Sequence, residues 1–88
     1  MEMVKVLFLM NKMILISKIE EVVSDIGEPD CKLINPFVVK CTEVQHILEP
    51  FLCEYTRQDT FMISSDKILT LAEPTPTLLE KYQDLIKK

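Results

Sequence analysis

The sequence predicts a small, mostly β protein: a strongly bent, five-stranded antiparallel barrel followed by a C-terminal α-helix. Three observations support this fold class. The length of 88 residues suits a single domain, which we place at residues 1–88. Short apolar, β-prone segments alternate with tight polar turns, which is typical of small barrels and bent sheets. The last residues change to a helical periodicity.

The β-prone segments predict strands at residues 3–10, 13–23, 31–41, 46–55 and 61–72. Asn11 and Lys12 form the first hairpin turn, and the DIGEPD segment before the third strand has the strongest turn composition. The third strand is apolar at both alternating sets of positions, which indicates burial on both sides. Pro36 marks an edge or a bulge in it, because proline cannot donate a ladder hydrogen bond. Pro50 predicts a kink in the fourth strand.

The C-terminal segment predicts a helix over residues 76–87. Its apolar residues recur at helical spacing and form one face, which we expect to cover the protein's own core: Leu78, Leu79, Tyr82, Leu85 and Ile86. Thr75 followed by Pro76 is a natural start, and Thr77 with Glu80 offers an alternative capping box. Lys87 and Lys88 suit the negative end of the helix dipole.

The composition argues against several classes of function. The net charge of −4 disfavours a broad nucleic-acid-binding surface, which usually carries a basic excess. The run VKVLFLMNKMILI is too short to span a bilayer and lacks a cleavage site, so we expect no membrane partner and a cytoplasmic location. With 48% hydrophobic residues, the chain has more apolar material than a small barrel can hide, which predicts a subunit interface.

The residues that usually carry chemistry are sparse. Cys31, Cys41, His46 and Cys53 lack the close ligand pairs of zinc sites, so we predict no metal and no cofactor. Cys31 and Cys41 would lie roughly 33 Å apart on one strand, too far to form a disulfide. No pattern places a nucleophile beside a base, and the single Gly excludes a phosphate-binding glycine loop. We therefore predict that the protein is not an enzyme.

Two polar turns remain as candidate binding sites. One lies around the start of the third strand, where Asp30 is followed by Lys32 and Asn35. The other interrupts the last predicted strand with the segment Ser64, Ser65, Asp66 and Lys67. Short polar groups beside a lysine suit phosphate or base edges, although Ser and Asp are also ordinary turn residues.

The order of segments resembles the Sm-like family of small barrels, which includes the Sm, LSm and Hfq proteins. It is closest to small Sm-like proteins of marine bacteriophages, particularly cyanophages. Three pieces carry the resemblance: the N-terminal hairpin VKVLFLMNKMILISKIEEV, the segment LINPFVV, and LEPFLCEY followed by FMISSDKILTLAEPTPTLLEKY. Ser64-Ser65 stands where the family pattern has Arg-Gly, and the spacing from Asp30 to Asn35 is one residue longer than in the Sm pattern.

The resemblance implies a cyclic homo-oligomer of about five to seven subunits that pair through their edge strands. It also implies binding of single-stranded RNA in a bacterial or phage-infected host cell. The candidate RNA contacts are Lys32, Asn35, Ser64, Ser65, Asp66 and Lys67. Two alternatives stay open, which are a structural or protein-interaction ring without nucleic acid, and a dimeric adaptor whose helix docks a partner.

Overall fold

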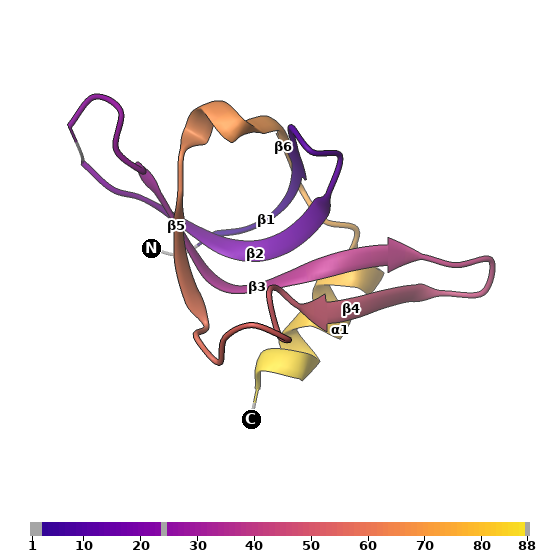
Figure 1. Ribbon diagram of the computed structural model, residues 1–88. Coiled ribbons are helices and arrows are strands. Elements are labelled where there is room, and N and C mark those ends of the chain that lie inside the picture. Colours follow the sequence, from indigo (N-terminus) through magenta and orange to yellow (C-terminus); the bar gives the residue numbers. More distant parts are fainter. Residues whose placement is uncertain (1–2, 24, 88) are drawn as a thin grey trace.

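The computed structural model describes residues 3–23 and 25–87, so residues 1–2, 24 and 88 of the predicted domain lie outside it, together with the charge expected at Lys88. Figure 1 shows a strongly curved sheet with one helix against it. The elements in chain order are β1 (Met3–Leu9), β2 (Ile14–Glu21), β3 (Cys31–Cys41), β4 (His46–Pro50), β5 (Thr60–Ile63), the 3₁₀ helix η1 (Ser65–Lys67), β6 (Ile68–Ala72) and α1 (Pro76–Ile86).

The strands form one antiparallel sheet in the order β4-β3-β2-β1-β6, and β5 pairs with the first half of β3. The prediction of a mostly β, antiparallel fold with a C-terminal helix is therefore confirmed. Within residues 3–23 and 25–87, no ladder joins β5 to β6, so the sheet is bent but not closed into a barrel. None of the helices in this part of the chain is long and apolar enough to cross a membrane.

A β-bulge in the middle of β3 decides which side chains face the interior. The ladder between β2 and β3 shifts register around Ser17, so that Asn35 and Pro36 together oppose this single residue. Asn35 has a φ of 53°, in the left-handed region that Asn tolerates better than most residues. Because the bulge adds one residue, Leu33 before it and Val38 after it belong to the same core cluster. The sequence does not predict this change of face within residues 31–41, but one of its two interpretations of Pro36, a bulge, is confirmed.

Apolar side chains form two clusters, one on each face of the sheet. The inner cluster lies inside the curve of the strands and has four buried leucines at its centre, Leu7, Leu9, Leu15 and Leu33. Each such leucine contributes about 1.5–3 kcal/mol when it leaves water. The helix-side cluster lies under α1 and consists of Ile16, Leu78 and Tyr82, with Phe37 and Val39 packed against it.

Helix α1 begins at the predicted residue. Thr75 is the N-cap, and its hydroxyl accepts a hydrogen bond from the backbone N–H of Leu78 at 3.3 Å. Pro76 occupies the first turn, where its missing N–H costs nothing. The helix buries Leu78 and Tyr82, which confirms the predicted core face, but Leu85 on the same face remains 39% exposed.

Two predicted strands are shorter than the sequence suggests. The segment 46–55 is extended only as far as Pro50, and tight turns follow, in which Leu52 has a φ of 57°. The segment 61–72 is two strands separated by η1. After Pro50 local hydrophobicity continues past the point where pairing with β3 stops, because pairing is a tertiary property that local pattern does not report. In the last predicted strand the break falls on the polar turn that the sequence places at Ser64–Lys67.

Candidate nucleic-acid interface

The polar turn predicted at Ser64–Lys67 is the short helix η1 between β5 and β6. The backbone N–H of Lys67 donates to the carbonyl of Ser64 at 3.0 Å, which closes the turn. The carbonyl of Lys67 accepts from the N–H of Met10 at 2.8 Å. Because Met10 follows β1 directly, this bond fixes the turn against the first hairpin.

Asp30 connects the turn to the start of β3. Its carboxylate accepts two hydrogen bonds from Ser65, one from the backbone N–H at 2.7 Å and one from the hydroxyl at 2.8 Å. These two bonds hold the pKa of Asp30 below its ordinary value of 3.8, since both favour the charged carboxylate. The two polar segments that the sequence singled out therefore meet, through a carboxylate outside the predicted contact set.

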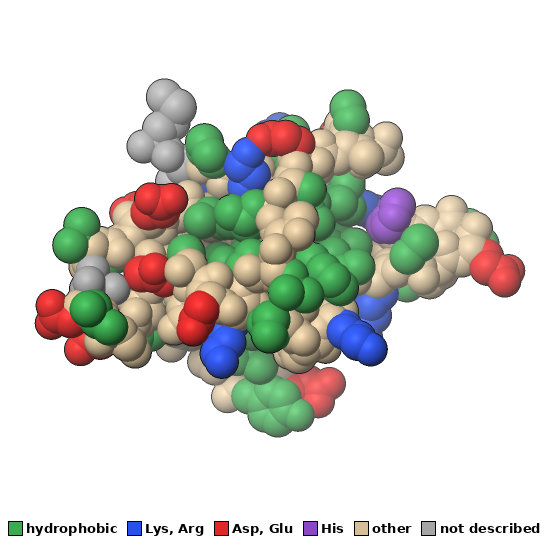
Figure 2. Space-filling view, turned by 90° about the horizontal axis from the view of Figure 1, so that it is seen from above, with side chains coloured by type: hydrophobic (Ala, Val, Ile, Leu, Met, Phe, Trp, Pro, Cys, Tyr) green, Lys and Arg blue, Asp and Glu red, His purple; other side chains and the backbone are tan. Residues whose placement is uncertain are grey.

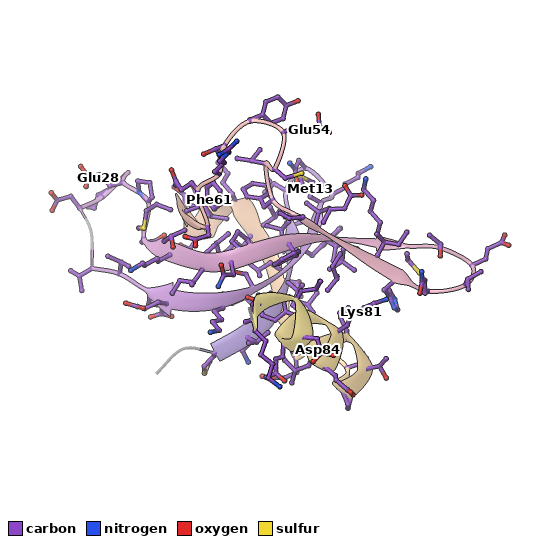
Figure 3. The ribbon with its side chains drawn as sticks, turned by 90° about the horizontal axis from the view of Figure 1, so that it is seen from below. Met13, Glu28, Glu54, Phe61, Lys81 and Asp84 are labelled. Atoms are coloured by element: carbon purple, nitrogen blue, oxygen red, sulfur yellow. The ribbon has the colours of Figure 1, made fainter. Side chains whose placement is uncertain are left out.

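The hollow beside this turn is acidic. It measures about 160 Å³ and is lined by Gly27, Glu28, Asp30, Ser64, Ser65 and Asp66. Figure 2 shows carboxylates gathered at the end of the molecule that carries the loop between β2 and β3, and Figure 3 places Glu28 on that loop. No Lys or Arg lines the hollow, so its charge opposes a phosphate group.

The two predicted basic side chains do not line this hollow, although Lys67 belongs to the same turn. Lys67 lines a different hollow, together with Leu9, Met10 and Asn11. Lys32 occupies a ladder position of β3, opposite a residue of β2 on one side and of β5 on the other. Within residues 3–23 and 25–87, no hydrogen bond or ion pair links the side chain of Lys32 to the turn.

The backbone of Asn35 holds the β3 bulge in place. Its backbone N–H donates to the backbone carbonyl of Asp59 at 2.7 Å, and its backbone carbonyl accepts from the hydroxyl of Tyr82 at 2.9 Å. The structure thus brings together Ser64, Ser65 and Asp66, but it places Lys32 and Asn35 further along β3. The sequence places Asp30 in the first polar turn but not among the RNA contacts, because its link to Ser65 depends on the β3–β5 register.

The remaining reactive side chains are the cysteines, the histidine and the carboxylates outside the polar turn. No cluster of three or more His, Cys, Asp or Glu side chains there has the arrangement needed to hold a metal. Cys31 is buried, and burial raises the pKa of its thiol, with further contributions from Asp30 and Glu21. A thiol with a raised pKa is a poor nucleophile at neutral pH.

Comparison with curated proteins finds no match. A match to a protein family extends over residues 2–87, nearly the whole chain. The family description contains no activity, ligand or partner, and it does not mention the Sm-like proteins. The chain belongs to this family, DUF6561, a family of unknown function.

Proposed function

We propose that this protein is a non-enzymatic subunit that assembles with copies of itself into a closed ring through the open edges of its sheet. The observation that carries the proposal is the pair of open edges without charged residues at β5 and β6. Within the described residues, β4 and β5 pair only with β3, and β6 pairs only with β1. The open strand β4 differs from the other two because it contains a charged residue, Glu49. Open edges present free backbone donors and acceptors, which proteins cover or block to avoid aggregation.

The exposed apolar residues on β6 support this arrangement. Ile68 packs against the inner cluster, whereas Leu69 and Leu71 remain 54% and 50% exposed. Met62 on β5 is also 46% exposed. Neither strand carries a charged residue, although charges are the usual protection of a solvent-exposed edge. Pairing β6 of one copy with β5 of the next would cover both edges.

A ring is favoured over a two-fold dimer because the two edges differ. A contact between different surfaces repeats from one copy to the next, and it closes into a ring when the rotation allows. A β5–β6 contact is of this kind. The five to seven subunits that the resemblance suggests belong to this proposal, and they correspond to about 50–70 kDa for a chain of 10.2 kDa.

Light scattering after gel filtration tests the proposal directly. The wild type should elute as a discrete oligomer, and Leu71→Lys should shift it toward 10.2 kDa by placing a charge at the edge strand. Val44→Lys is the matched control, because Val44 is 90% exposed at the β3–β4 turn, away from both edges. A monomeric wild type, or an oligomer insensitive to Leu71→Lys, would refute the proposed interface.

Binding of single-stranded RNA is the second candidate function. The bond pair between Asp30 and Ser65 favours it, since it joins the two segments that the Sm-like resemblance associates with RNA. The acidic lining of the hollow opposes it. Anisotropy of short U-rich and A-rich RNAs should show binding that weakens as salt rises, because phosphate contacts release counterions. Absence of binding at low salt would exclude RNA and leave the ring proposal intact.

A further inference from the structure

The loop at residues 51–59, between β4 and β5, is held at both ends by the β3 bulge. At its start the N–H of Phe51 donates to the carbonyl of Pro36 at 3.0 Å. At its end the carbonyl of Asp59 accepts from the N–H of Asn35 at 2.7 Å. Because Asn35 and Pro36 are neighbours, the two ends of the loop lie beside the same part of β3. Compact loops with close ends are frequently functional; we call this segment the clasped loop.

A pocket of about 290 Å³ lies between the clasped loop and the bulge. Its apolar part includes Phe37, Phe51 and Phe61. The rings of Phe51 and Phe61 meet edge to face, with centroids 5.2 Å apart and planes at 79°. In Figure 3, Phe61 lies on the body of the molecule, whereas Glu54 marks the outer bend of the loop. Aromatic rings in this arrangement favour a further ring as a neighbour.

The polar part of the pocket contains one cation. Arg57 is the only arginine of the sequence, and it lines the pocket with Gln58 and Asp59. Gln58 and Asp59 already have hydrogen-bond partners. The side-chain amide of Gln58 donates to the carbonyl of Thr60, and the carboxylate of Asp59 accepts from the hydroxyl of Thr60 at 3.3 Å. Within residues 3–23 and 25–87, the guanidinium of Arg57 has neither a hydrogen bond nor an ion pair. Its donors therefore remain available to a ligand.

We propose that this pocket binds a small aromatic ligand that carries an anionic group, either a carboxylate or a phosphate. The volume is at the lower end of small-molecule pockets, which suits one ring system. Phe51 and Phe61 contact the ring, and the planar fork of Arg57 binds the anion, a geometry that guanidinium matches in both carboxylate and phosphate. The negative net charge does not attract anions from a distance, and the carboxylate of Asp59 also lines the pocket, so the selectivity for an anion depends on direct contact with Arg57.

The test is a titration of the full chain with indole-3-acetate, in which the fluorescence of the indole ring measures binding. The protein contains no Trp, and its two Tyr emit at shorter wavelengths than indole, so the indole signal comes from the ligand. Indole-3-acetamide has the same ring without the charge. We expect the acetate to bind about tenfold more tightly, because hydrogen bonds between charged groups are stronger than neutral ones. Uridine monophosphate and uridine, measured by amide chemical shifts because uracil does not fluoresce, form a second matched pair, which separates a nucleotide ligand from an aromatic acid.

Variants assign the effect to the pocket. Arg57→Gln should remove the preference for the acid while leaving the binding of indole-3-acetamide unchanged. Lys40→Gln is the matched control, because Lys40 is an exposed cation that pairs with Glu49 at 2.9 Å and does not line the pocket. Amide chemical shifts under titration should change at residues 35, 37 and 51–61. The proposal is overturned if charged and neutral ligands of both pairs bind equally or not at all, if Arg57→Gln retains the preference, or if the shifts change elsewhere.

Discussion

Replacing Tyr82 by Phe should destabilise the protein, because the hydroxyl of Tyr82 satisfies the backbone at the β3 bulge. This side chain projects from α1, is fully buried, and contacts Phe37 edge to face, with ring centroids 5.8 Å apart. Its hydroxyl donates to the carbonyls of Asn35 and Ile34 at 2.9 and 3.1 Å and accepts from the N–H of Lys18 at 3.2 Å. The bulge interrupts the β2–β3 ladder at this point, so the hydroxyl supplies hydrogen bonds that a regular ladder would otherwise supply.

The magnitude follows from the groups that lose this hydroxyl. Tyr82→Phe keeps the ring and its packing but leaves a partly buried N–H and two partly buried carbonyls with one partner fewer. A buried unsatisfied group costs about 1–3 kcal/mol, so we expect the free energy of unfolding to fall by about that amount. In a domain of this size, each kcal/mol lowers the melting temperature by roughly 4–8 °C.

Urea and thermal unfolding, followed by circular dichroism, measure this difference. Tyr55→Phe is the matched control, since it removes the same hydroxyl from a side chain that is 82% exposed. We expect the control to stay within about 0.5 kcal/mol of the wild type, as surface substitutions usually do. Equal stability of the two variants would refute the inference that Tyr82 holds α1 to the bulge.

Three further predictions concern single positions. Ser65→Ala should reduce the free energy of unfolding at neutral pH but not in acid, whereas Ser64→Ala should not show this pH dependence. The reason is that the lowered pKa of Asp30 stabilises the fold above the ordinary value of 3.8 and loses this effect as pH falls through the lowered value, so curves that do not converge in acid would contradict the assignment. Gly27→Ala should cost about 1 kcal/mol in urea unfolding, purely through its φ of 88°, since no atom lies within 4 Å of the added Cβ; an unchanged midpoint would argue against this backbone conformation. Thr75→Ala should cost about 1 kcal/mol through the lost N-cap, and helix content that resists the change would show that the cap is dispensable.

The C-terminal helix shows how far local pattern reaches. Its N-cap, its first residue and its buried positions follow from Thr75-Pro76 and from the spacing of apolar residues, all within one segment. The exposure of Leu85 does not follow, because the packing of α1 on the sheet is a tertiary property. The same limit applies to the fourth predicted strand, which ends at Pro50 where the chain turns into the clasped loop.

The candidate site required tertiary information to a greater extent. Ser65 and Asp30 are 35 positions apart, and only the pairing of β5 with β3 brings them within 2.7 Å. The charge beside the turn also differs from the expected basic site. The hollow there is acidic, and the side chains of Lys32 and Lys67 do not line it. Arg57 was overlooked because it stands in a segment that reads as an ordinary turn, and its aromatic neighbours come from distant parts of the chain.

The sequence by itself determined that this protein is mostly β with one C-terminal helix, because turn residues, β-prone segments and helical spacing are local properties. Only the tertiary structure decided which face each side chain of β3 occupies. The bulge at Asn35 and Pro36 inserts one residue, and a one-residue shift exchanges the two faces of every position that follows. The polar turn, the clasped loop and the open edges all depend on how β3 pairs with its neighbouring strands. Residues near in sequence do not specify that pairing.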